Sequence, residues 1–207
     1  MPEDLSRRFP QDKASSAILR EITGRTEWLT FSDTILMFQQ IVEDNSDARY
    51  FQWTIFLLTA IHLQNKLFEF GLPLRGVIHF GKYLVKETTF AGRAIVEAYR
   101  VAQSLDLAGC GVTREAIGDI STTLSSGQEL KTDPVFGPML VSYLSPVKQG
   151  QPIKMHFVNH LGNKKMLDIR QYVLQSFWKH GKDITPEAES KVNNTEQFFR
   201  FLVSRSG

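Results

Sequence analysis

The segment of residues 25–40 constrains the fold of this chain more than any other. β-branched and aromatic residues lie on both sides of Ser32 and Asp33, without the spacing of three to four residues between apolar positions that is typical of a helix. Ser and Asp favour tight turns because their side chains hydrogen-bond to the nearby backbone. The pattern therefore predicts a β-hairpin that carries an acidic side chain at its tip.

A long buried helix and a short strand are expected after the hairpin. The polar residues 44–47 can cap a helix, and residues 48–70 are apolar almost all round until a Gly-Leu-Pro sequence ends the pattern. Residues 74–80 are rich in branched side chains and lie between a proline and a glycine, which is typical of a buried central strand. The order hairpin, helix, strand indicates an α/β fold.

The rest of the chain continues to alternate between helices and strands. Apolar spacing and turn residues predict helices at 91–105, 113–123 and 164–180 and strands at 107–112, 139–144 and 151–159. The last two strands are joined by a turn that contains Pro and Gly, so they should form a second hairpin. A final helix is expected after Thr185, which can cap it, with Pro186 at its first position. Because no repeat or linker interrupts this order, we predict a single α/β domain over residues 1–207.

Charge and composition exclude several classes of protein. The 24 basic and 22 acidic side chains give a net charge of +2 and are spread along the whole sequence, so no nucleic-acid partner is expected. The single Cys110 provides neither a disulfide framework nor a cysteine zinc site, which fits a reducing compartment. The most apolar window, residues 53–61, is shorter than the ~20 residues that span a bilayer, and the N-terminal residues lack the apolar region of a signal peptide. We therefore expect a cytoplasmic protein without a membrane anchor.

Several histidines and phenylalanines are interpreted as structural. His156 and His160 have the spacing of a metal-binding pair on a helix, but the residues around them predict a strand, so we expect a surface or edge-strand pair. His79 falls on a predicted central strand, where a hydrogen-bonded core histidine is common. The last helix carries aromatic residues that should pack on the domain or on a partner, namely Phe198, Phe199 and Phe201.

Segments that follow one another along the chain resemble the class III nucleotide cyclases. In those enzymes a Gly-Asp hairpin is followed by a helix, a strand of the type Leu-Arg-hydrophobic-Gly-Ile-His-x-Gly, and a helix of the type Gly-Asp-x-Val-Asn-x-Ala-x-Arg. The counterparts here lie within about residues 27–112 and are Phe31-Ser32-Asp33, Leu74-Arg75-Gly76-Val77-Ile78-His79-Phe80-Gly81 and Gly92-Arg93-Ala94-Ile95-Val96-Glu97-Ala98-Tyr99. Together with the later turn Ser145-Pro146-Val147-Lys148, they look closest to a divergent bacterial branch that includes the pyrimidine cyclases of anti-phage defence.

This resemblance implies a fold, a reaction and a site. The fold would be ferredoxin-like, of the palm type, with a mostly antiparallel central sheet, flanking helices and extra C-terminal helices. The reaction would convert a nucleoside triphosphate to a 3′,5′-cyclic monophosphate and pyrophosphate in a homodimer, with two magnesium or manganese ions held by two carboxylates. Asp33 would be one of these metal ligands, and Ser32 beside it would help to bind the metal cofactor. Arg100 would be catalytic, because it matches the helix Arg that contacts the phosphates.

The departures from the family pattern leave two alternatives open. The second metal carboxylate of the family ends a strand that precedes the hairpin, whereas Asp4 and Asp12 do not follow an apolar strand. The helix Asn and the residues that read adenine are replaced by Val96, Leu29 and Thr89. These losses fit a pyrimidine substrate, UTP or CTP, and they fit equally a degenerate module that binds a nucleotide or a partner without catalysis. In structural terms alone, an aspartate in a turn and an arginine on a helix are common solvated residues.

Overall fold

The chain is a mixed α/β structure. The computed structural model describes residues 26–31, 33–41, 45–86, 89–161, 168–181 and 185–205. The chain forms two compact units that divide after Phe56. Among the described residues, no helix combines the length and the apolar character that crossing a membrane requires.

The first unit contains the predicted hairpin. Strands β1 (Thr26–Phe31) and β2 (Thr34–Gln39) pair antiparallel from Thr26 opposite Gln39 to Phe31 opposite Thr34. This register leaves two residues for the turn, so the hairpin prediction is confirmed. Helix α3 (Ser46–Glu69) begins in this unit, where the Asn45 side chain accepts hydrogen bonds from the first main-chain N–H groups and caps the helix.

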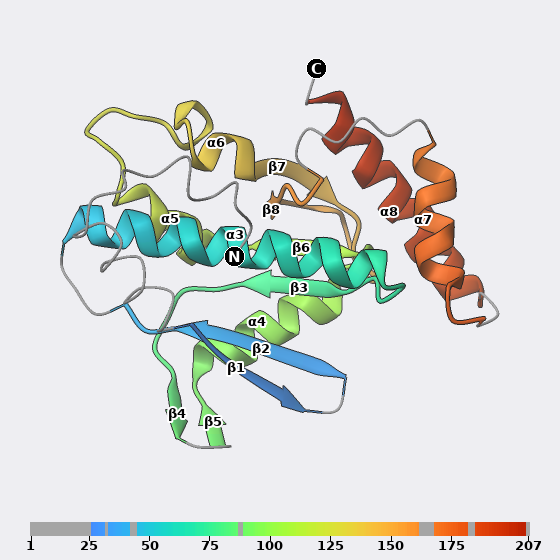
Figure 1. The fold of residues 1–207 in the computed structure, drawn as a ribbon, viewed down its shortest axis with the longest axis horizontal. Helices are drawn as coiled ribbons and strands as arrows, with labels where there is room; N and C mark the ends of the chain where they lie inside the picture. Colours follow the sequence, from blue (N-terminus) through green and yellow to red (C-terminus); the bar gives the residue numbers. More distant parts are fainter. Residues whose placement is uncertain are drawn as a thin grey trace. The chain divides into compact units, whose positions relative to one another are not determined.

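The second unit is built on a four-stranded sheet with the order β3-β6-β8-β7 (Figure 1). Strands β3 (Arg75–Ile78) and β6 (Gly109–Val112) are parallel, whereas β8 (Ile153–Val158) is antiparallel to both of its neighbours, β6 and β7 (Leu140–Ser145). The β7–β8 pairing confirms the second predicted hairpin. A parallel pair needs a crossover connection, and helix α4 (Arg93–Ser104) lies in the connection between β3 and β6.

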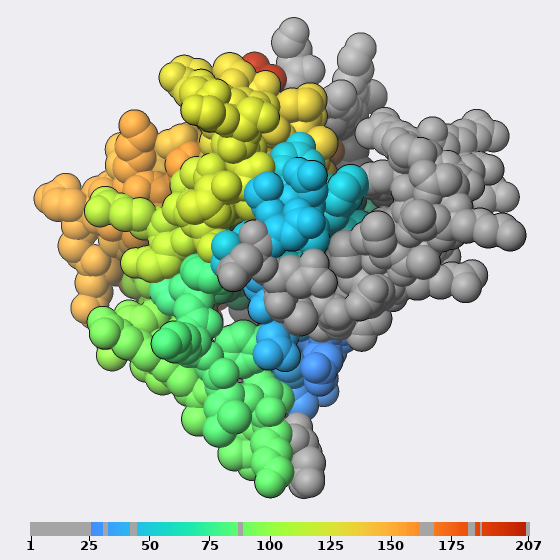
Figure 2. Space-filling view, turned by 90° about the vertical axis from the view of Figure 1, so that its left-hand side faces the viewer, coloured from blue at the N-terminus to red at the C-terminus, as the bar shows by residue number. Residues whose placement is uncertain are grey.

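A small hairpin in the same connection was not predicted. Strands β4 (Leu84–Lys86) and β5 (Thr89–Ala91) pair antiparallel over three residues each. Figure 2 shows the green residues of this region at the surface. Leu84 of β4 is 66% exposed.

The remaining helices are α5 (Arg114–Ser121), the 3-10 helix η1 (Leu130–Thr132), α6 (Phe136–Met139), α7 (Ile169–Trp178) and α8 (Pro186–Ser204). Helices α5, α7 and α8 begin with side-chain caps, whereas the N-cap residues of η1 and α6 make no side-chain cap hydrogen bond. The hydroxyls of Thr113 and Thr185 accept hydrogen bonds from the first turns of α5 and α8, and Pro186 occupies the first position of α8 as predicted. Asp168 caps α7 by accepting a hydrogen bond from the main-chain N–H of Gln171.

The core of the second unit is an aromatic cluster between the sheet and α8. Phe157 of β8 and Phe198 of α8 are fully buried, with ring centroids 5.0 Å apart. The ring centroid of Phe199 lies 4.9 Å from that of Phe68, near the end of α3. The prediction that the C-terminal phenylalanines pack on the domain is therefore confirmed for Phe198 and Phe199.

The two histidines near the end of β8 are not a surface or edge-strand pair. Strand β8, which carries His156, lies between β6 and β7, and the sheet encloses it on both sides. His160 is only 2% exposed, and its ring lies 5.0 Å from that of Phe199. The prediction was wrong because strand order depends on pairings between distant segments, which the local pattern does not contain.

Candidate functional site

Asp33 lies in the turn of the first hairpin, with its side chain exposed to solvent. The Thr34 hydroxyl donates a hydrogen bond of 3.3 Å to Asp33 Oδ1. A carboxylate in this position keeps most of its acceptor capacity for water or a cation, since an ionised carboxylate offers about four lone-pair sites. Ser32, the other predicted residue of the turn, lies outside the described residues.

Arg100 lies on an exposed face of α4. Its side chain is 71% exposed, and Nη1 lies 3.6 Å from Glu97 Oε1. Arg93 Nε lies at the same distance from the same oxygen, so Glu97 stands between two arginines. Both separations exceed hydrogen-bond length, and exposed ion pairs of this kind contribute little stability. The guanidinium of Arg100 is therefore free to turn toward an anionic group.

The same part of α4 exposes large apolar side chains. Val96 is 53% exposed and Tyr99 is 55% exposed, and both are close in sequence to Arg100. Residues three and four positions apart share a helix face, so Val96, Tyr99 and Arg100 present an apolar surface beside a cationic one. Such a surface is typical of a contact with another macromolecule.

Among the described residues, Asp33 is the one candidate metal ligand that the sequence predicted. Among them, no three or more His, Cys, Asp or Glu side chains come together in a group that could hold a metal ion. Asp33 belongs to the first unit and Arg100 to the second. Asp4 and Asp12 lie outside the described residues.

A polar cluster lies where the parallel strands β3 and β6 end. Thr113 Oγ1 and His79 Nδ1 are 3.1 Å apart, and His79 Nδ1 is 3.8 Å from Glu115 Oε2. The main-chain N–H of Glu115 itself and then the Thr113 hydroxyl lower the pKa of the Glu115 carboxyl, and the charge of His79 adds to this effect. The sequence indicated His79 but not Glu115, for which the only local signal was its place in the first turn of a predicted helix.

This cluster does not have the geometry of a nucleophile with its base. A catalytic hydroxyl and an orienting carboxylate must contact opposite nitrogens of the imidazole, whereas Thr113 and Glu115 both approach Nδ1 of His79. The Thr113 hydroxyl also accepts the main-chain hydrogen bond from Ala116 that caps α5. The cluster therefore attaches the start of α5 to the end of β3. The hydrogen bond expected for His79 is present, but the prediction that His79 lies on a central strand was wrong, because β3 is at the edge of the four-stranded sheet and ends at Ile78.

Lys191 on α8 is the basic side chain with the most altered environment. Its Nζ donates a hydrogen bond of 3.3 Å to the Pro73 carbonyl oxygen and lies 5.6 Å from the centre of the Phe177 ring. Burial lowers the pKa of Lys191 to about 8, and the positive charges of Arg75 and Lys148 act in the same direction, against the carboxylate of Asp106. No local sequence pattern indicates this environment, because these residues come from distant segments.

Comparisons with protein-family models, with curated proteins and with solved structures find no match to this chain. The resemblance to class III cyclases therefore depends on the sequence motifs alone.

Proposed function

We propose that this chain is a nucleotide cyclase domain of the class III type with the palm-type fold. It converts a nucleoside triphosphate, UTP or CTP in preference to a purine, to a 3′,5′-cyclic monophosphate and pyrophosphate. In this proposal it works as a homodimer and serves as a signal generator in bacterial anti-phage defence.

The observation that carries the proposal is the exposed carboxylate of Asp33 in a two-residue hairpin turn. The donor chemistry fits magnesium or manganese, because hard divalent cations prefer carboxylate oxygens. When bound, such ions would activate the ribose 3′-hydroxyl and neutralise the triphosphate. Asp33 would hold the metal, and the antiparallel pairing on both sides of the turn would fix the position of its carboxylate.

Arg100 would act on the phosphates. Negative charge builds on the leaving pyrophosphate as the 3′-oxygen attacks the α-phosphorus, and a nearby guanidinium stabilises that charge. Releasing Arg100 from Glu97 costs little, since the two groups are 3.6 Å apart and the arginine is 71% exposed. Exposed Val96 and Tyr99 support the homodimer, because a second subunit would remove their apolar surface from water.

The second candidate is a cyclase-fold module that binds a nucleotide or a partner without chemistry. The exposed apolar surface of α4 favours it equally, because dimerisation requires that surface whether or not catalysis follows. The sequence pattern also favours it, since the two-metal reaction needs a second carboxylate and neither Asp4 nor Asp12 follows an apolar strand.

The decisive experiment incubates the purified chain with each of the four nucleoside triphosphates and manganese, and measures cyclic product and pyrophosphate. We expect product with UTP or CTP, and its loss in Asp33→Asn, which removes the charge while keeping a side chain that suits the turn. Asp47→Asn is the control, because it removes another acidic side chain from the same unit, in the first turn of α3. Product formation that is unchanged in Asp33→Asn contradicts the site, and no product from a folded dimer supports the second candidate.

A further inference from the structure

Three basic side chains from distant segments come together in the second unit. They are Arg75 at the start of β3, Lys148 in the connection between β7 and β8, and Lys191 on α8. The positive charges of Arg75 and Lys148 both act on the ammonium of Lys191, and the carboxylate of Asp106 opposes them. With both lysines protonated, three positive charges of the described residues therefore meet one negative charge, and we call this group the basic cluster.

Hydrogen bonds hold two of these side chains in place. Lys191 Nζ donates to the Pro73 carbonyl oxygen at 3.3 Å, which joins α8 to the segment before β3. Arg75 Nη1 donates to the Leu105 carbonyl oxygen at 3.1 Å. Leu105 directly follows α4, where carbonyl groups have no partner within the helix. The guanidinium of Arg75 is therefore fixed at the end of α4, next to the main chain of Asp106.

Main-chain contacts bring Lys148 to the same place. Its N–H donates to the Ser104 carbonyl oxygen at 2.9 Å, and the N–H of Asp106 donates to the Pro146 carbonyl oxygen at 3.2 Å. The two residues between these bonds pair as an isolated antiparallel bridge. The segment after α4 and the turn after β7 are therefore held side by side.

The carboxylate of Asp106 is held by neutral donors on α8. Its Oδ2 accepts hydrogen bonds of 2.8 Å from the Ser190 hydroxyl and from Asn194 Nδ2. Asn194 Nδ2 also donates to the main-chain carbonyl oxygen of Asp106 at 3.0 Å. Asp106 is thus fixed to α8, and its charge offsets only one of the three cations.

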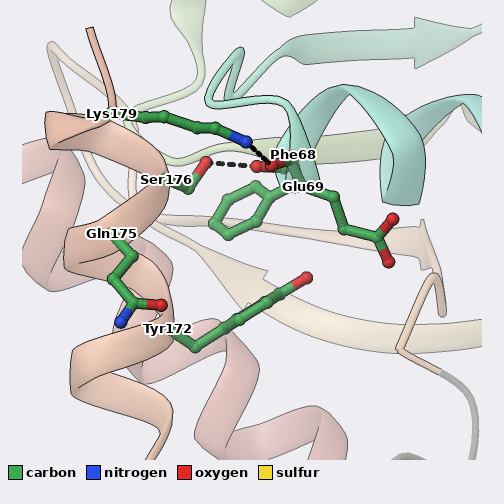
Figure 3. A pocket seen from close by; sticks show the side chains of 6 residues that line it. All are labelled: Phe68, Glu69, Tyr172, Gln175, Ser176 and Lys179. Atoms are coloured by element: carbon green, nitrogen blue, oxygen red, sulfur yellow. Dashed lines mark hydrogen bonds between the residues drawn. The ribbon is translucent and has the colours of Figure 1, made fainter.

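The basic cluster keeps donors for a ligand. The guanidinium of Arg75 has further N–H groups at Nε and Nη2, since its described bonds come from Nη1. Lys148 is exposed, and its ammonium makes no hydrogen bond or ion pair with any residue that the structure describes. Lys179 on α7 is different, because its Nζ donates to the Glu69 carbonyl oxygen at 2.7 Å at the end of α3, as a dashed line in Figure 3 shows.

We propose that the basic cluster binds a tetrahedral oxyanion with two negative charges, which is the chemical form of inorganic phosphate and of a phosphate monoester. Arg75, Lys148 and Lys191 would donate charge-assisted hydrogen bonds to its oxygens. A dianion would balance the excess of positive charge that Asp106 leaves. The proposal is independent of the cyclase activity, since it does not use Asp33 or Arg100.

Isothermal titration calorimetry of the full chain with sodium sulfate tests the proposal. Sulfate has the shape and charge of the phosphate dianion and does not change its charge near neutral pH, and sodium chloride keeps the ionic strength constant. Lys191→Met should weaken sulfate binding by at least about tenfold, because it removes a charged donor that is partly buried. Lys148→Met should weaken it by about fivefold, because Lys148 is more exposed to solvent.

Proton uptake separates a role of Lys191 from general attraction of anions. The pKa of Lys191 is about 8, and a bound dianion would raise it. Sulfate binding near pH 8 should therefore take up about half a proton, and the affinity should fall at higher pH. Titration in two buffers with different ionisation enthalpies measures this uptake, which Lys191→Met should lack.

Inorganic phosphate and phenyl phosphate separate the two sources of the ligand. Equal affinities indicate the phosphate group of a larger molecule, and a preference for inorganic phosphate of about tenfold or more indicates the free ion. Either result agrees with an oxyanion site.

The matched control is Lys131→Met, which removes an exposed lysine that is paired with Glu129 at 2.7 Å. It should leave the affinity for sulfate unchanged. Absence of sulfate binding, an affinity that is the same in Lys148→Met and Lys191→Met as in the wild type, or an equal loss in Lys131→Met would overturn the proposal.

Discussion

Replacement of Lys191 by methionine should stabilise the protein at neutral pH. The ammonium of Lys191 is half-buried on α8, where the positive charges of Arg75 and Lys148 face it and the carboxylate of Asp106 offsets them only in part. Methionine has a similar length, carries no charge and adapts to irregular packing. The substitution therefore removes an unfavourable charge without leaving a large cavity.

The magnitude follows from the pKa. A value of about 8 in place of 10.5 means that the folded state disfavours the charged form of Lys191 by about 3 kcal/mol relative to the unfolded chain. The methionine variant also lacks the hydrogen bond from Lys191 Nζ to the Pro73 carbonyl oxygen. Losing this bond lowers the free energy of unfolding by about 1 kcal/mol. We expect Lys191→Met to raise the free energy of unfolding by about 2 kcal/mol at neutral pH.

The dependence on pH has a definite sign. Because folding lowers the pKa of Lys191 from 10.5 to about 8, the unfolded chain binds more protons between these two values. The stability of the wild-type protein should therefore rise with pH across this window, as the lysine of the folded state loses its proton. The free energy of unfolding of Lys191→Met should not rise with pH in this way. The variant should therefore be no more stable than the wild type by about pH 10.

Urea unfolding of both proteins at neutral pH and near pH 10 measures the effect. The control is Lys86→Met, which removes an exposed lysine from β4 and should keep the wild-type dependence on pH. If Lys191→Met is less stable than the wild type at neutral pH, or if the two proteins show parallel dependence on pH, the argument from burial and repulsion is refuted.

Three further predictions concern Arg100 on α4 and two glycines. Arg100→Ala should lower the rate of cyclic-nucleotide formation by about 100-fold, because it removes a hydrogen-bond donor that stabilises the transition state. Arg93→Ala is the control, and equal losses of rate in both variants would contradict the specific role of Arg100. Gly92→Ala should lower the thermal unfolding temperature, because Gly92 has φ +148° and an added Cβ would lie 2.8 Å from Tyr83 Cα. Gly118→Ala should raise it, since an added Cβ would meet no atom within 4 Å apart from its chain neighbours and the backbone of its own helix, and alanine favours the helix by about 0.8 kcal/mol. Changes of opposite sign at the two positions would contradict these predictions.

Features that depend on neighbouring residues could be predicted from the sequence. The hairpin around Asp33, the extent of α3, the cap at Thr185 with Pro186 and the β7–β8 hairpin all follow from turn chemistry, apolar spacing and capping within a few residues. Very short strands could not be predicted in this way. The strands β4 and β5 have three residues each, too few to show a period.

The sequence predicted the residues of the candidate site one by one and not their arrangement in space. Asp33 and Arg100 are exposed, one in a turn and one on a helix, as their local patterns indicate. Their chemical roles came from the resemblance to a family and remain proposals. Ser32 lies outside the described residues, and its role also stays a prediction.

The sequence alone thus determined the identity and order of most elements, because hydrogen bonds within turns, helices and caps join residues that are close along the chain. Tertiary structure decided which distant segments meet. It placed β8 inside the sheet, brought Pro73, Arg75 and Lys148 to Lys191, and brought Tyr172 within the electrostatic influence of Glu69. These environments arise from burial and from charges that segments far apart in the sequence bring together, and no local pattern records either of them.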